Sequence, residues 1–134
     1  MDSSKILTKL DQLEKYLAKY DEIVPISEEI YINSFEKQLA VERLLQISIE
    51  IMIDVAMMLI KQKHLGLPAD EDDVFDKLQP FFKKIEKYKE MKRFRNLLVH
   101  RYGEVNNKQV FYNATNCIED FYSFMTEVKN ILSK

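Results

Sequence analysis

The amino-acid sequence predicts an all-α fold in which four main helices and a short fifth pack as an antiparallel bundle, in a single domain spanning residues 1–134. Apolar residues recur at helical spacing along most of the chain. Two glycines and three prolines leave few turn residues for a many-stranded sheet. A length of 134 residues, 46% of them hydrophobic and 31% charged, is typical of a folded domain with one hydrophobic core.

The first helix is predicted by apolar residues at helical spacing behind the candidate N-caps Ser3 and Ser4. These residues are Ile6, Leu7, Leu10, Leu13 and Leu17. The segment Asp21–Pro25 ends this helix. A long second helix is expected from about Glu28 or Ser34 to about His64. Gly66 and then Pro68 follow it in the order that commonly ends a helix.

Three further helices follow along the chain. A short one is predicted over Asp70–Leu78, and a longer one from about Pro80 to Arg101 or Tyr102. Gly103 stands where a C-terminal cap is expected. Asn106 then caps a last helix that is predicted to run to about Leu132.

The central helix is apolar on nearly every side. Of the 17 residues in Leu44–Ile60, 13 are apolar, and such a helix must be buried around most of its circumference. A homodimer built on this helix is one explanation, because a small chain has limited surface with which to cover it. A helix wrapped entirely within its own chain is the alternative. Glu50 and Asp54 near its middle argue against a membrane span.

The charge distribution and the cysteine content indicate which ligands and which cellular compartment suit this chain. The segment Lys83–Arg101 carries a net charge of +6, which leaves −8 on the rest of the chain. Such a strip attracts polyanions locally, although charge runs are more often a solvated helix face. The single cysteine, Cys117, excludes an internal disulfide and a cysteine-cluster zinc site. Together with an N-terminus that lacks the pattern of a signal peptide, this predicts a cytoplasmic protein.

Arg95 is expected in the middle of the apolar stripe of its helix. Tyr88 and Tyr102 fall within about 20° of it on a helical wheel. A guanidinium in this position must meet a carboxylate or line a cleft. The candidate partners on the central helix are Glu50 and Asp54, one helical turn apart.

The opposite face of the same helix is basic and ends in a histidine. Its polar residues are Lys89, Lys92, Arg93, Asn96 and His100. A neutral imidazole can take a proton from a ribose 2′-hydroxyl or give one to a leaving 5′-oxygen, and a guanidinium can stabilise the charge on phosphorus. This chemistry needs no metal or cofactor, and the sequence contains no HExxH or DxD pattern. The ordinary alternative for an Arg-x4-His spacing is surface charge.

The segment Phe94–Tyr102, FRNLLVHRY, resembles the Arg-x4-to-6-His signature of the HEPN superfamily. A Tyr two residues after the His makes it similar to the HepT-like toxin branch. Gln38–Ile60 resembles the long second helix of that branch, and the resemblance covers about residues 1–132. Asn106 stands where the branch commonly has Asp, and both residues cap helices.

The resemblance implies a metal-independent ribonuclease toxin that dimerises and forms a cleft where two copies of the motif meet. It implies that Arg95 and His100 are the catalytic pair and that Asn96 is the polar residue after the arginine. It also implies an antitoxin partner, a nucleotidyltransferase of the MNT type, that attaches AMP to Tyr102. The alternative is a catalytically silent HEPN dimer that binds a nucleotide or supports a partner nucleotidyltransferase.

Overall fold

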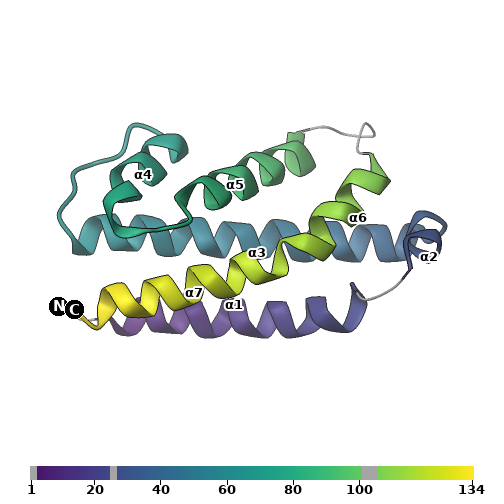
Figure 1. The fold of residues 1–134 in the computed structure, drawn as a ribbon, viewed down its shortest axis with the longest axis horizontal. Coiled ribbons are helices and arrows are strands. Elements are labelled where there is room, and N and C mark those ends of the chain that lie inside the picture. The colour runs from purple at the N-terminus through teal and green to yellow at the C-terminus, as the bar shows by residue number, and fades with distance from the viewer. Residues whose placement is uncertain (1–2, 25–26, 101–105) are drawn as a thin grey trace.

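The computed structural model describes residues 3–24, 27–100 and 106–134, and these residues form helices and connections without any strand. The elements in chain order are α1 (Ser4–Ile23), α2 (Glu28–Ile32), α3 (Phe35–Gln62), α4 (Glu71–Leu78), the 3₁₀ turn η1 (Gln79–Phe81), α5 (Ile85–His100), α6 (Asn107–Asn116) and α7 (Ile118–Leu132). Figure 1 shows α1 and α7 along one side of the long helix α3, with α4 and α5 on the other. The predicted all-α class is confirmed. Within the described ranges, no helix combines the length and apolarity needed to cross a membrane.

The long second helix of the prediction is divided into α2 and α3. Ser27 caps α2 by accepting a hydrogen bond from the Ile30 backbone N–H at 3.1 Å. Ser34 caps α3 in the same way, with the Lys37 N–H at 3.2 Å. Both expected starting points are therefore real helix starts, and they belong to two helices.

The last predicted helix is also divided, at Cys117. Asn106 caps α6 as expected, because its side chain accepts hydrogen bonds from the N–H groups of Lys108 and Gln109. The helix then breaks after Asn116. At this break the buried Tyr20 hydroxyl of α1 donates a hydrogen bond to the Ala114 carbonyl. The hydrogen bond ties α1 to the end of α6, and burial raises the pKa of the Tyr20 hydroxyl far above its usual range, so the group stays protonated.

The helix that was predicted to start near Pro80 begins later than expected. Pro80 lies in the turn η1, and α5 starts only at Ile85. In the connection between them, the Lys83 backbone N–H donates a hydrogen bond to Glu127 Oε1 of α7 at 2.6 Å. This tertiary contact holds the connection against α7.

The chain itself covers most of the central helix. α1 packs along α3, and α4, α5 and α6 cover the rest of it. In the segment Leu44–Ile60 only Asp54 and Met57 are exposed, and Met57 is the one apolar residue among them. The structure therefore favours the alternative in which α3 is wrapped within one chain. The apolar surface that this segment leaves outside the chain is limited to Met57 and to the partly buried Leu44, Ile47 and Met58.

Candidate active site

Arg95 is held on α5 by carboxylates of two other helices. Its Nη1 lies 3.4 Å from Glu50 Oε2 of α3, and its Nη2 donates to Glu71 Oε1 of α4. Its Nε donates to the side-chain oxygen of Asn96 at 3.0 Å. The Arg95 side chain is only 11% exposed, whereas the two glutamates are about 40% exposed. The guanidinium is thus positioned by a partly solvated pair of acids.

The other predicted partner of Arg95 lies elsewhere. Asp54 forms an ion pair with Lys9 of α1 at 3.5 Å, and its side chain is more than half exposed. Sequence reasoning missed Glu71 as a partner. The available signal was the acidic first turn of α4, which precedes a strongly basic helix in the chain.

The acidic side of α4 pairs in order with the basic side of α5. Besides Glu71 with Arg95, Asp72 pairs with Lys92, and Asp76 pairs with Lys89 at 2.7 Å. The hydrogen bond from Lys92 holds the pKa of Asp72 below its usual range, and the hydrogen bond to Asp76 raises the pKa of Lys89. We call these three pairs the α4–α5 charge ladder.

The charge ladder changes the electrostatics of the predicted RNA-contacting face. Lys92 is only 5% exposed, and its ammonium is occupied by Asp72. Lys89 is occupied by Asp76 and lies 3.6 Å from Glu86. Arg93 is exposed and has no ion pair with a described residue. Of the predicted basic stripe, Arg93 is therefore the cation most open to a new anion.

His100 is the last residue of α5, and it is exposed. It follows Arg95 by five residues, so the two side chains leave the helix about 140° apart and about 7.5 Å apart along its axis. Asn96 is partly buried beside Arg95. Tyr102, the predicted site of AMP attachment, lies outside the described residues. No group of three or more His, Cys, Asp or Glu side chains within the described part of the chain is arranged to hold a metal ion.

Comparison with known proteins identifies a family that this chain resembles over most of its length. The family described as ribonuclease HepT-like matches residues 13–128. A tRNA nuclease HepT from Aphanizomenon flos-aquae (strain 2012/KM1/D3) is 25% identical over 131 residues, which cover 95% of this chain and 89% of that protein.

Solved structures agree with this match. A tri-AMPylated Shewanella oneidensis HEPN toxin in complex with MNT antitoxin is 26% identical, with a TM-score of 0.86 and coverage of 97% of this chain and 99% of that one. A toxin–antitoxin crystal structure with AMP-PNP is 25% identical, with a TM-score of 0.84 and coverage of 93% and 97%. The family match covers most of the chain, and the fold agrees with it over nearly its whole length. The chain belongs to the HepT-like family of the HEPN superfamily, and the two solved structures named above contain toxins of toxin–antitoxin systems.

Proposed function

We propose that this protein is a metal-independent endoribonuclease toxin that cleaves RNA with Arg95 and His100. The family is described as a ribonuclease, and a relative that spans almost the whole chain is a tRNA nuclease. The single observation that carries the proposal is that α5 holds a positioned guanidinium and, five residues later, an exposed imidazole. Both groups have the chemistry that phosphodiester cleavage requires.

The two residues have complementary roles in this proposal. The neutral imidazole of His100 takes the proton of a ribose 2′-hydroxyl, whose oxygen then attacks the adjacent phosphorus, or it gives a proton to the leaving 5′-oxygen. The guanidinium of Arg95 stabilises the additional negative charge on the pentacoordinate phosphorus through charge-assisted hydrogen bonds. Fragments with a cyclic 2′,3′-phosphate and a free 5′-hydroxyl are the expected products.

Arg95 and His100 diverge around α5, which supports a dimeric site. Side chains that leave one helix about 140° apart do not both point at the same phosphorus atom. In a dimer, a second copy of the motif faces the first across a cleft. The arginine of one copy and the histidine of the other can then approach the same phosphorus atom from different sides. The exposed apolar residue on this helix is Leu97, which is 38% exposed and lies three residues before His100.

Arg93 and Asn96 are proposed to contact the RNA next to the cleaved bond. Arg93 is exposed, and Asn96 lies against the guanidinium of Arg95. Lys89 and Lys92 can bind RNA phosphates only if they first release Asp76 and Asp72 of α4. Their share of the binding energy is therefore reduced by the cost of breaking two ion pairs.

A nucleotidyltransferase of the MNT type is proposed as the antitoxin, and it silences the toxin by attaching AMP to Tyr102. The AMPylated Shewanella toxin in complex with its MNT antitoxin supports this proposal. The added phosphate is an anion that arrives near the motif. It would compete with RNA for the guanidinium of Arg95.

One observation favours the alternative of a catalytically silent HEPN dimer. Arg95 is already paired with Glu50 and Glu71, so part of its charge is neutralised before any RNA binds. Expression of the chain alone in a growing culture separates the two functions. The toxin arrests growth and degrades RNA, and the His100→Ala variant does neither. Normal growth and intact RNA at equal expression of both proteins would favour the silent dimer.

A further inference from the structure

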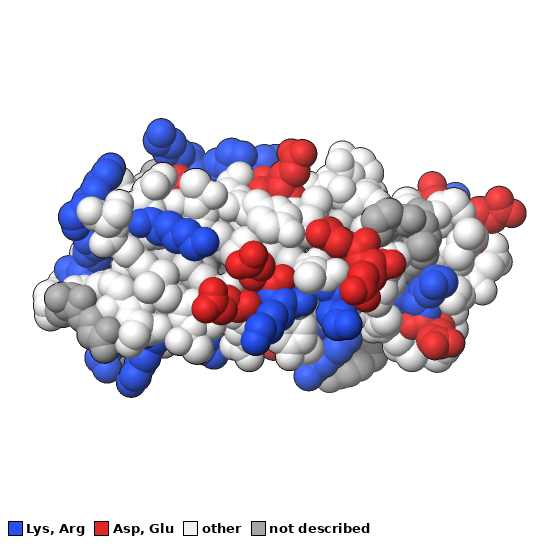
Figure 2. Space-filling view, turned by 90° about the horizontal axis from the view of Figure 1, so that it is seen from below, with Lys and Arg blue, Asp and Glu red and all other residues white. Residues whose placement is uncertain are grey.

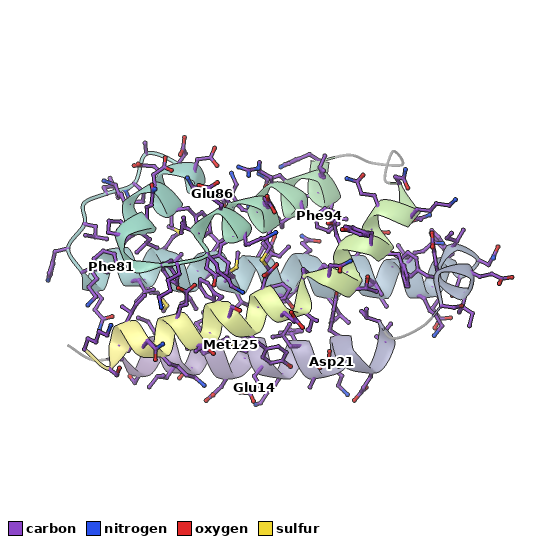
Figure 3. The ribbon with its side chains drawn as sticks, in the orientation of Figure 1. Glu14, Asp21, Phe81, Glu86, Phe94 and Met125 are labelled. Atoms are coloured by element: carbon purple, nitrogen blue, oxygen red, sulfur yellow. The ribbon has the colours of Figure 1, made fainter. Side chains whose placement is uncertain are left out.

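A second basic surface lies away from the motif, at the end of the molecule where α1 begins and α7 ends (Figure 1). It is an open groove of about 890 Å³ between the C-terminal half of α7 and the connection from α4 to α5. Lys63, Lys83, Lys84 and Lys134 line it together with Phe81 and Tyr122. Figure 3 shows Phe81 at this end of the molecule, and Figure 2 shows Lys and Arg side chains gathered there. We call this surface the terminal groove.

The lysines of the terminal groove differ from those of the charge ladder because their charge is not neutralised. None of Lys63, Lys83 and Lys84 forms an ion pair with another residue that the structure describes. The Lys84 ammonium donates to the neutral Ser123 hydroxyl at 3.2 Å, and the Lys63 ammonium lies 5.8 Å from the centre of the Phe81 ring. The groove is therefore locally positive on a chain whose net charge is −2.

Glu127 is the one acidic side chain among the described residues that line the groove, and neutral donors occupy its two oxygens. Its Oε1 accepts the Lys83 backbone N–H at 2.6 Å, and its Oε2 accepts the Tyr88 hydroxyl at 2.5 Å. Burial and the hydrogen bond to Glu127 raise the pKa of Tyr88, so this donor keeps its proton. Glu127 thus fixes the wall of the groove without pairing with a lysine ammonium.

Two aromatic rings are exposed beside these lysines. Phe81 is 37% exposed and Tyr122 is 41% exposed, and both line the groove. Cations that follow a phosphate chain, with exposed rings on which bases stack, are the combination that binds single-stranded nucleic acid. A protein partner with acidic side chains would use the lysines but would have no need of stacking.

We propose that the terminal groove binds single-stranded RNA at a distance from the bond that is cleaved. The proposal rests on the ribonuclease function above and extends it to how the substrate is held. α5 has 16 residues and is about 24 Å long, and it separates Lys84 from His100. At about 3.4 Å per stacked nucleotide, an RNA strand that contacts both sites spans roughly seven nucleotides.

The test is equilibrium binding of a fluorescent single-stranded RNA of about 20 nucleotides to the His100→Ala chain, which leaves the RNA intact. One variant carries Lys63→Gln, Lys83→Gln and Lys84→Gln in addition. A matched control carries Lys5→Gln, Lys15→Gln and Lys19→Gln, which remove the same charge from the exposed side of α1. Each phosphate contact contributes a slope of about −0.7 to the dependence of log K on log salt for a single strand, so three contacts contribute about −2.

The groove variant is expected to bind RNA on the order of 100-fold more weakly at about 0.1 M salt. The slope of its log K against log salt should be less steep by about 2, while the control changes little. Arginine at the same three positions restores binding, which excludes misfolding as the cause. Phe81→Leu weakens RNA binding by about fivefold or more, because a base loses its stacking partner. Equal affinities of the groove and control variants would overturn the proposal. Cleavage of RNA by the unmodified chain is measured separately, so a groove that fails and a ribonuclease that fails are distinguished.

Discussion

Arg95 of α5 and Glu71 of α4 form an ion pair, and this pair begins a ladder in which Asp72 and Asp76 engage Lys92 and Lys89 of α5. The acidic residues of α4 thus neutralise cations of α5 that we propose as part of the RNA-binding face. Each of these pairs has at least one partner whose side chain is more than 40% exposed, so solvent screens them and their contribution to folding is small. Their main effect is to reduce the positive charge that α5 presents to an anion.

Replacing Glu71 with Gln is expected to strengthen RNA binding and to cost at most about 1 kcal/mol of folding free energy. The guanidinium of Arg95 then keeps Glu50 alone, at 3.4 Å, and more of its charge is available to a phosphate. Binding of RNA and thermal unfolding are measured together. The control is Glu119→Gln, which removes one exposed charge from α7. Weaker RNA binding by Glu71→Gln than by the control would instead make Glu71 a residue that positions Arg95 for the RNA.

Glu42 predicts a pH dependence of folding stability. It is half-buried on α3, burial raises its pKa above 4.5, and no described residue gives it an ion pair. A carboxyl with a raised pKa in the folded state favours folding at low pH, and that contribution is lost as the pH rises through the folded pKa. Glu42→Gln should therefore be more stable than the natural chain at pH 7, and the difference should shrink as the pH falls toward 4.5. A constant difference at every pH would show that the carboxylate is not the cause.

Tyr102 is predicted to accept AMP from a partner nucleotidyltransferase. Incubation of the chain with an MNT-type nucleotidyltransferase, ATP and Mg²⁺ should add one or more AMP groups, which mass spectrometry places on a tyrosine. Tyr102→Phe should stay unmodified and should still arrest growth when the partner is present, because the phenol oxygen is the acceptor. Full neutralisation of Tyr102→Phe would mean that the partner acts as a bound protein and not through modification.

A homodimer remains a prediction, and the structure changes where its interface is expected. The central helix is covered by its own chain, so the expected interface moves away from Leu44–Ile60 and toward the C-terminal part of α5. Sedimentation at micromolar concentration should give twice the 16.0 kDa mass of one chain. Leu97→Asp should shift the protein toward the monomer, whereas Leu67→Asp on the exposed connection before α4 should not. A species of single-chain mass for the natural protein would contradict the dimeric site.

The helices were predictable from the sequence where the signal is local. The period of apolar residues and the caps at Ser34 and Asn106 predicted most of the helical chain. The break at Cys117 was not predictable, because it coincides with a hydrogen bond from Tyr20, which is distant in the sequence. The late start of α5 likewise coincides with a hydrogen bond from the Lys83 backbone N–H to Glu127 of another helix.

In the candidate site, too, local sequence signals were predictive and tertiary contacts were not. Its position on the apolar stripe predicted that Arg95 meets a carboxylate or lines a cleft, and Glu50 was one of the candidate carboxylates. Helical spacing could not predict Glu71, because the approach of α4 to α5 is a tertiary contact. Neither could it show that Lys92 is buried against Asp72, since a wheel of one helix carries no information about its neighbours.

Cleavage of RNA by the purified chain tests the proposed function most directly. The natural chain should cut RNA in the presence of EDTA, and His100→Ala should reduce the rate by about 10²- to 10⁴-fold, as expected for the loss of a general acid or base. Arg95→Ala should also abolish cleavage while the protein stays folded. The matched control is His64→Asn, which removes the other histidine at a position with a φ of 56° that asparagine tolerates. Cleavage that stops on chelation, or that survives His100→Ala unchanged, would contradict the mechanism.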